Sequence, residues 1–153
     1  MKNQFLSSAS AVLILSLLTS NAMANECSVT VESNDAMQFN LKSMVVPKTC
    51  SKFSITLTHT GKMPKSAMGH NLVVSKTSDM AAISKDGIGA GVANDYLKPQ
   101  DSRVLAHTKL IGGGESTTIE LVVAQLKAGE SYSYFCSFPG HVSLMKGSVN
   151  LGS

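Results

Sequence analysis

Apolar and polar side chains alternate along residues 53–59, and this alternation constrains the fold more than any other feature. Phe53, Ile55 and Leu57 share one face of an extended chain, and hydroxyl side chains occupy the other face. A period of two residues is typical of a strand with one buried and one exposed face. Similar short segments recur, and they predict strands over residues 28–33, 38–46, 53–59, 71–75, 102–108, 117–123, 131–136 and 147–151.

Turn-forming residues such as Gly112-Gly113-Gly114 separate these segments. Many short strands with turns between them indicate an all-β sandwich or barrel. One segment departs from the alternation, because Ser78 can cap a helix in which Met80 and Ile83 have i, i+3 spacing. We therefore predict a single domain with a short helix, over residues 79–87, inserted between strands.

Residues 1–24 have the features of a secretory signal peptide. Lys2 precedes an apolar stretch over residues 11–18, and Ala22-Met23-Ala24 supplies the small residues of a cleavage site. The apolar stretch is shorter than the roughly 20 residues that span a bilayer. We therefore expect no membrane insertion, and a mature domain over residues 25–153 that is exported to the periplasm.

Composition and charge exclude several classes of protein. The chain is 43% hydrophobic and 15% charged, so it has enough apolar side chains for a core, unlike a disordered chain. The formal net charge of +3 is spread along the sequence. Such a weak, dispersed charge argues against a nucleic-acid partner.

The chain has three cysteines, so at least one is unpaired in an oxidising compartment. Cys27 and Cys50 lie at the ends of alternating segments, whereas Cys136 lies in a peptide of different character. We therefore predict a disulfide between Cys27 and Cys50. Cys136 is then a free thiol, and its presence in an oxidising space calls for a functional reason.

Cys136 belongs to a cluster of side chains that can bind a metal. Cys136, His141 and Met145 are spaced C-x4-H-x3-M, and Phe138-Pro139-Gly140 forms a turn that brings the imidazole back toward the thiol. His70, in an apolar turn, is the best candidate for a second imidazole. One thiolate, two imidazoles and one thioether form the ligand set of an electron-transfer copper site.

Other functions fit these residues less well. A thiol hydrolase built on Cys136 and His141 would need an orienting group and an oxyanion hole, which the sequence does not offer in evident form. A copper oxidase or nitrite reductase needs a second copper centre, which His59 and His107 cannot build. We expect structural or surface roles for these two histidines.

A copper chaperone or storage protein remains an alternative, and it would favour several exchangeable Met or His ligands. A metal-free interaction domain would leave the Cys136 thiol unexplained. Taken singly, the candidate ligands also have plainer interpretations. These are an inert buried thiol, a turn histidine and a core methionine.

The candidate ligands lie within longer stretches, over residues 25–29, 63–65, 68–71, 95–99, 101–104, 106–112, 135–141 and 144–147. In these stretches the sequence resembles the azurins, which are blue-copper proteins of the cupredoxin family. The resemblance implies an eight-stranded Greek-key cupredoxin sandwich with a short inserted helix, and the same Cys27–Cys50 disulfide. It implies a protein that is not an enzyme and carries one electron on one copper ion per chain. The implied partners are redox proteins such as c-type cytochromes, nitrite reductase, peroxidase or oxidase.

The resemblance also implies how the metal is held. His70, Cys136 and His141 are the expected copper ligands. Met145 is then the distant axial ligand, and the carbonyl oxygen of Gly69 faces it from the other side.

Other residues are expected to act around these ligands. Backbone N–H groups of Asn71 and Phe138 are expected to hydrogen-bond the thiolate and tune the potential of the metal. The exposed edge of His141 is the expected point of electron entry and exit. Around it the resemblance implies an apolar docking patch, formed by Met37, Met63, Pro64, Ala67, Met68, Ile88, Phe138, Pro139 and Gly140.

Overall fold

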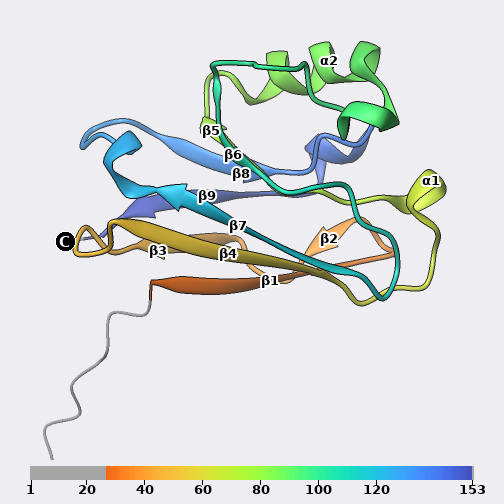
Figure 1. Cartoon of the computed structure of the whole chain (residues 1–153), viewed down its shortest axis with the longest axis horizontal. Helices are drawn as coiled ribbons and strands as arrows, with labels where there is room; N and C mark the ends of the chain where they lie inside the picture. Colours follow the sequence, from red (N-terminus) through yellow and green to blue (C-terminus); the bar gives the residue numbers. More distant parts are fainter. Residues whose placement is uncertain (1–26, 153) are drawn as a thin grey trace, which may run out of the picture.

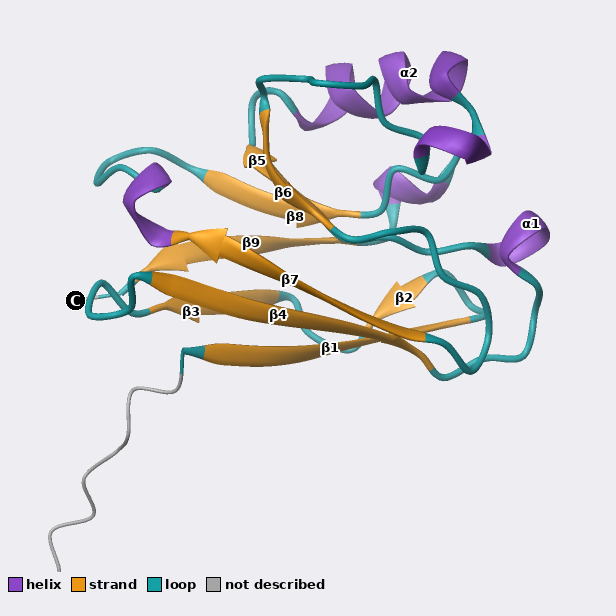
Figure 2. Ribbon diagram, viewed as in Figure 1, coloured by secondary structure: helices purple, strands orange, loops and turns teal. Residues whose placement is uncertain are grey.

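The computed structural model describes residues 27–152, which fold into two β-sheets packed as a sandwich (Figure 1). The first sheet has the strand order β2-β1-β4-β7, and the second has the order β3-β9-β8-β5-β6 (Figure 2). This arrangement confirms the predicted all-β sandwich. The strands are β1 (Ser28–Asn34), β2 (Gln38–Phe39), β3 (Ser43–Val46), β4 (Lys52–His59), β5 (Val73–Lys76), β6 (Val104–His107), β7 (Ser116–Val122), β8 (Tyr132–Phe135) and β9 (Lys146–Leu151).

Strand β4 carries the alternation from which the fold was predicted. Phe53, Ile55 and Leu57 are 1% exposed or less, and they lie in the main hydrophobic core. The strand is central to its sheet, because it pairs in parallel with β1 at Val29 and antiparallel with β7 at Ile119. Burial of one face and pairing on both edges fix its register.

The strand predicted over residues 38–46 forms in two pieces that belong to different sheets. β2 pairs with β1 in the first sheet, and β3 pairs with β9 in the second. Between them, the Asn40 N–H donates to the Glu32 carbonyl at 3.0 Å, and the Asn40 side-chain oxygen accepts the Glu32 N–H at 2.9 Å. The chain then crosses to the other sheet. The described residues therefore contain nine strands, with one of the eight predicted strands divided.

The predicted helix over residues 79–87 is present as α2 (Met80–Ala90), which lies above the edge of the second sheet at β5 and β6 in Figure 1. It continues past Gly87, because this glycine serves a close approach and not a helix end. A Cβ at position 87 would collide with the backbone carbonyl of Tyr96. The helix ends at Gly91, whose φ of 71° lies in the left-handed region.

Short helical segments connect the remaining strands. The sequence analysis did not predict α1 (Lys65–Met68), which lies at one end of the sandwich. The 3-10 helices are η1 (Val92–Asn94), η2 (Val123–Gln125) and η3 (His141–Ser143). Within residues 27–152, no helix is both long enough and apolar enough to cross a membrane.

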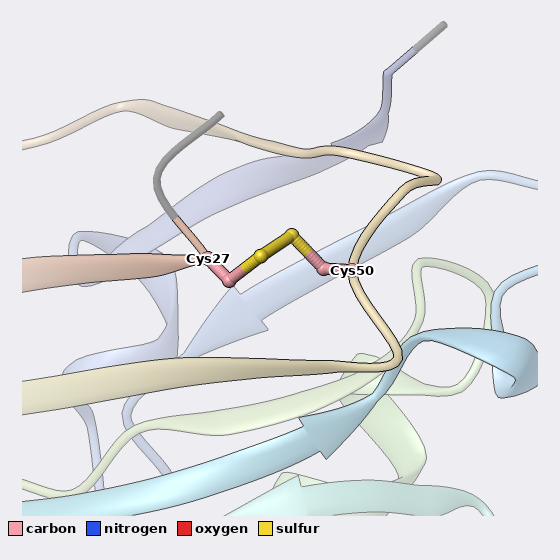
Figure 3. Close-up of a disulfide and its surroundings, with 2 residues drawn as sticks. All are labelled: Cys27 and Cys50. Carbon is pink, nitrogen blue, oxygen red and sulfur yellow. A yellow bond between two sulfur atoms is a disulfide. The ribbon is translucent and has the colours of Figure 1, made fainter. Parts of the chain in front are cut away.

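The predicted disulfide between Cys27 and Cys50 is confirmed (Figure 3). Cys27 lies directly before β1, and Cys50 lies shortly before β4, so the bond joins the starts of two paired strands. Cys136 is the free cysteine and is buried. The predicted signal peptide, residues 1–24, lies outside the described residues.

Candidate metal centre

The candidate ligands come from two connections at one end of the sandwich, one between β4 and β5 and one between β8 and β9. His70 follows α1 and forms an antiparallel bridge with Ile111, with N···O distances of 3.0 and 2.8 Å. Cys136 directly follows β8, and its N–H donates to the carbonyl of Met145 at 3.0 Å. His141 begins η3, and its carbonyl accepts the N–H of Met145 at 2.8 Å. Backbone hydrogen bonds therefore fix each ligand segment.

Three of the predicted ligands meet at a single point. The Cys136 Sγ lies 3.9 Å from Nδ1 of His70 and 3.6 Å from Nδ1 of His141. The ligand atoms of the three residues lie within 4.8 Å of one another. Cys136 and His70 are 0% exposed and His141 is 3% exposed. His70, Cys136 and His141 therefore form a buried metal-binding group.

The two imidazoles are in the state that a metal requires. The Nε2 of His70 lies 2.9 Å from the carbonyl oxygen of Asn34. A carbonyl only accepts hydrogen bonds, so Nε2 carries the hydrogen and Nδ1 presents its lone pair to the site. Burial lowers the pKa of His70 to about 4, although the bond to Asn34 acts in the opposite direction. Burial also lowers the pKa of His141. Both rings are therefore neutral at pH 7.

The environment of Cys136 suits a thiolate bound to a cation. Burial raises the pKa of the thiol to about 12, whereas hydrogen bonds from the backbone N–H groups of Asn71 and Phe138 lower it. Without a cation, burial prevails and the thiol keeps its proton. On metal binding the thiol would release its proton to water, and the two N–H donors would then face the charge of the thiolate. The donor set fits a thiophilic metal such as copper.

The carbonyl of Gly69 lies beside the group, and Met145 is buried in the core that also contains Cys136. Met145 is 0% exposed and forms part of the main core. The carbonyl oxygen of Gly69 lies 4.0 Å from the Cys136 Sγ. A Cβ at position 69 would lie 2.9 Å from the side chain of Leu110, so a glycine permits the close packing of this segment.

The other two histidines lie outside the metal-binding group. His59 is fully buried at the end of β4, and its ring stacks on that of His70. His107 is exposed, and its Nδ1 lies 3.1 Å from the carbonyl of Thr108.

Sequence reasoning missed the side-chain bonds that connect the ligand segments. The Asn71 Oδ1 accepts the N–H of Ser137 at 2.9 Å, and the Asn71 Nδ2 donates to the Ser137 Oγ at 2.8 Å. These buried residues directly follow His70 and Cys136. Each is a polar residue directly after a candidate ligand, and this position in the sequence could have indicated their role.

Much of the expected docking patch is at the surface. Met63 is 39% exposed and Ile88 is 57% exposed. The remaining members are exposed at Pro64, Ala67 and Gly140, and half-buried at Met37, Met68, Phe138 and Pro139.

The expected exposed edge of the His141 ring stays a prediction. His141 as a whole residue is 3% exposed, and the ring of Phe138 lies against it with centroids 4.5 Å apart. Leu144 was not among the residues expected in the docking patch, although it directly follows η3 and is 56% exposed.

Several known proteins have a similar sequence, and one solved structure has a similar fold. A sequence model described as copper binding proteins, plastocyanin/azurin family, matches residues 25–152. Azurin from Alcaligenes faecalis is 60% identical over 127 residues, which cover 83% of this chain and 99% of that protein. Azurin from Pseudomonas aeruginosa is 51% identical over 141 residues, which cover 92% of this chain and 95% of that protein.

The fold is similar to that of a solved azurin. The structure of the azurin Az-iso2 from the obligate methylotroph Methylomonas sp. strain J has a TM-score of 0.81 and 43% sequence identity to this chain. The match covers 83% of this chain and 98% of that one. The family match includes the whole metal-binding group, His70, Cys136 and His141.

Proposed function

Since the chain belongs to the plastocyanin/azurin family of copper-binding proteins, we propose that its buried His-Cys-His group holds the copper ion. The protein is a copper electron-transfer protein and not an enzyme. His70, Cys136 and His141 are the strong ligands in this proposal. The thioether of Met145 and the carbonyl oxygen of Gly69 are the weak ones.

One observation carries the proposed site. A thiol and two imidazole Nδ1 atoms, all buried, lie within 4.8 Å of one another. Packing alone does not explain two neutral imidazoles turned toward one buried thiol, whereas a shared metal ion does. Thiolate and thioether ligands suit Cu(I), and imidazole suits both oxidation states.

When bound, copper supplies the Cu(II)/Cu(I) couple that carries one electron. The chain supplies fixed ligand positions. The bridge to Ile111 and the bond to Asn34 hold His70, and the carbonyl of Met145 holds the Cys136 backbone. Because these bonds are made within the fold, the ligands keep their places between electron transfers. Burial also excludes water from the group.

The partners are redox proteins, and we propose that they dock on the apolar patch around His141. The Phe138 ring contacts the ring of His141, which connects the patch to a ligand. Within the patch, Ile88 and Phe138 line an apolar groove of about 240 Å³ between α2 and the turn before η3. Exposed apolar surface of this kind is typical of interaction sites. The candidate partners are c-type cytochromes, nitrite reductase, peroxidase and oxidase.

We further propose that the protein works in the periplasm. The features of a signal peptide in residues 1–24 support export, with a mature domain over residues 25–153. The disulfide between Cys27 and Cys50 supports an oxidising compartment.

A visible absorption titration tests the proposed site. Residues 25–153 are titrated with Cu(II) and then reduced with ascorbate, with Cys136→Ser as the control. We expect an intense blue thiolate-to-copper band that saturates near one equivalent, is bleached by ascorbate and is absent from the control. Binding of several copper ions without reversible bleaching would contradict the proposal and support copper storage.

A further inference from the structure

Asp95 and Tyr96 have an unusual backbone conformation near the metal-binding group. Both have a φ of 53°, in the left-handed region, and Asp95 directly follows η1. Few residues other than glycine adopt this conformation, and those that do are often held there by surrounding contacts at functional sites. The contacts of Asp95 are therefore informative.

The backbone carbonyl of Asp95 accepts hydrogen bonds from two residues that follow ligands. The Asn71 Nδ2 donates to it at 2.8 Å, and the Ser137 Oγ donates to it at 3.3 Å. Asn71 follows His70, and Ser137 follows Cys136. One carbonyl therefore connects both ligand segments to the segment after α2.

This carbonyl also determines how the Asn71 amide is oriented. One Nδ2 hydrogen goes to Asp95 and the other to the Ser137 Oγ, at 2.8 Å. The Oδ1 is then left to accept the N–H of Ser137, at 2.9 Å. In a flipped amide, the NH₂ group would face the Ser137 N–H, and two donors would oppose each other.

The carboxylate of Asp95 anchors the residue from the other side. Its Oδ1 accepts the N–H of Leu110 at 2.8 Å. Leu110 packs against Gly69 and precedes Ile111, which forms the bridge to His70. The side chain thus fixes the backbone turn that directs the carbonyl toward Asn71.

We propose that Asp95 is a positioning residue for electron transfer, one that fixes the Asn71 amide and through it the segments after His70 and Cys136. These segments carry the backbone N–H groups of Asn71 and Phe138, which face the Cys136 sulfur. Within the described part of the chain, Asp95 has no hydrogen bond to a ligand side chain, and it acts through Asn71, Ser137 and Leu110. The inference rests on the proposed function for its effect on the reduction potential.

Three substitutions separate the effect of the Asp95 carboxylate from the effect of its left-handed backbone conformation. Asp95→Asn keeps an oxygen acceptor for the Leu110 N–H and tolerates the left-handed region. Asp95→Gly permits the left-handed conformation but removes the carboxylate that fixes it. Asp95→Ala removes the carboxylate and disfavours the conformation. Glu115→Ala is the matched control, because Glu115 accepts the Gly112 N–H at 2.8 Å in the same connection but does not reach Asn71.

The first readout uses copper-free protein. Exchange of the two Asn71 Nδ2 hydrogens is followed by NMR, and we expect it to be at least tenfold faster in Asp95→Ala than in the parent. We expect parent-like exchange in Asp95→Asn and in Glu115→Ala. This readout stands even where the parent fails to show a blue copper band, so it separates failure of this inference from failure of the proposed function.

The second readout uses copper-loaded protein. We expect Asp95→Ala to shift the reduction potential and to lower the electron self-exchange rate severalfold, with Asp95→Asn close to the parent. If Asp95→Ala does not fold, Asp95→Gly compared with Asp95→Asn makes the same test. The inference would be overturned by a variant, Asp95→Ala or Asp95→Gly, that loses only as much stability as Glu115→Ala. That variant would also have to show parent-like Asn71 exchange and an unchanged reduction potential.

Discussion

The imidazole rings of His59 and His70 are stacked, with centroids 4.5 Å apart and an angle of 15° between their planes. The Nδ1 of His59 accepts the N–H of Gly61 at 3.0 Å, so its Nε2 is left to donate to the carbonyl of Met68 at 3.1 Å. His59 therefore packs against His70 of the metal-binding group and also holds the segment that carries Met68, a residue of the proposed docking patch.

The first prediction concerns His59. His59→Phe keeps an aromatic ring beside His70 but leaves the Gly61 N–H and the Met68 carbonyl without their partner. Because each buried polar group left unsatisfied costs about 1–3 kcal/mol, urea unfolding is expected to show a loss of about 2–6 kcal/mol for the two groups. The blue band and the copper stoichiometry are expected to remain. A folded His59→Phe protein that binds no copper would instead make His59 a ligand, and His107→Gln serves as the exposed control.

The second prediction concerns the weak ligand. Met145→Leu conserves volume in a buried position, so it is expected to cost less than about 1.5 kcal/mol of stability. The protein is expected to stay blue and redox-active, with a shifted reduction potential because the thioether is gone. Voltammetry and the visible spectrum check this, with the exposed Met63→Leu as a control that leaves the potential unchanged. A colourless Met145→Leu protein that still binds copper would contradict the weak-ligand assignment.

The third prediction concerns the docking patch. Ile88 is 57% exposed on α2 and lines the groove beside Phe138. Ile88→Lys places a charge in this apolar surface, so the rate of electron transfer with a c-type cytochrome is expected to fall severalfold while the potential stays the same. Val122→Lys is the matched control, because Val122 is 43% exposed at the opposite end of the sandwich, where it pairs with Lys52. Equal rates for the two variants would contradict docking at this patch.

Side-chain periodicity explains how much of the fold could be predicted. The alternation in β4 indicates which face is buried, and the structure has that face in the core. Periodicity does not indicate which sheet a strand joins, so the division of residues 38–46 between two sheets depends on pairing with β1 and β9. Likewise, Gly87 looks like a helix end in the sequence, and only the packing of Tyr96 explains it.

The metal-binding group could be predicted because cysteine and histidine side chains are possible metal ligands in any fold. A free cysteine and two histidines are recognisable as possible ligands before the fold is known. The carbonyl of Asp95 has no such signature, because every residue has a carbonyl and only the tertiary contacts hold this one in a left-handed turn. The stacking of His59 on His70 also depends on the register of β4 and not on local sequence.

The fourth prediction concerns the disulfide. In the chain-entropy model, a crosslink between Cys27 and Cys50, with a sequence separation of 23, contributes about 3 kcal/mol. The double substitution to alanine is expected to lower the free energy of unfolding by about that amount. β1 separates the disulfide from Asn34, which bonds to His70, so the blue band and the reduction potential are expected not to change. A shifted potential would show that the two ends of the sandwich are coupled.

The last prediction concerns acid stability without copper. Burial lowers the pKa of His70 to about 4 from an ordinary value of 6.5. Between these values the unfolded chain binds a proton that the folded chain does not, so stability is full above pH 6.5 and falls as the pH approaches 4. The loss from this residue is expected to reach about 3 kcal/mol. Lowered pKa values of His141 and Asp101 act in the same direction, the latter at lower pH because it is a carboxyl group.

A comparison of variants isolates the part of this loss that belongs to His70. In copper-free His70→Gln, the side-chain amide can still donate to the Asn34 carbonyl but does not titrate, so urea unfolding between pH 7 and pH 4.5 is expected to show a shallower decline than in the parent. His107→Gln changes an exposed histidine and is expected to keep the parent's slope. An equal slope in the parent and His70→Gln would mean that His70 does not cause the acid sensitivity, because the shift in its pKa requires that difference.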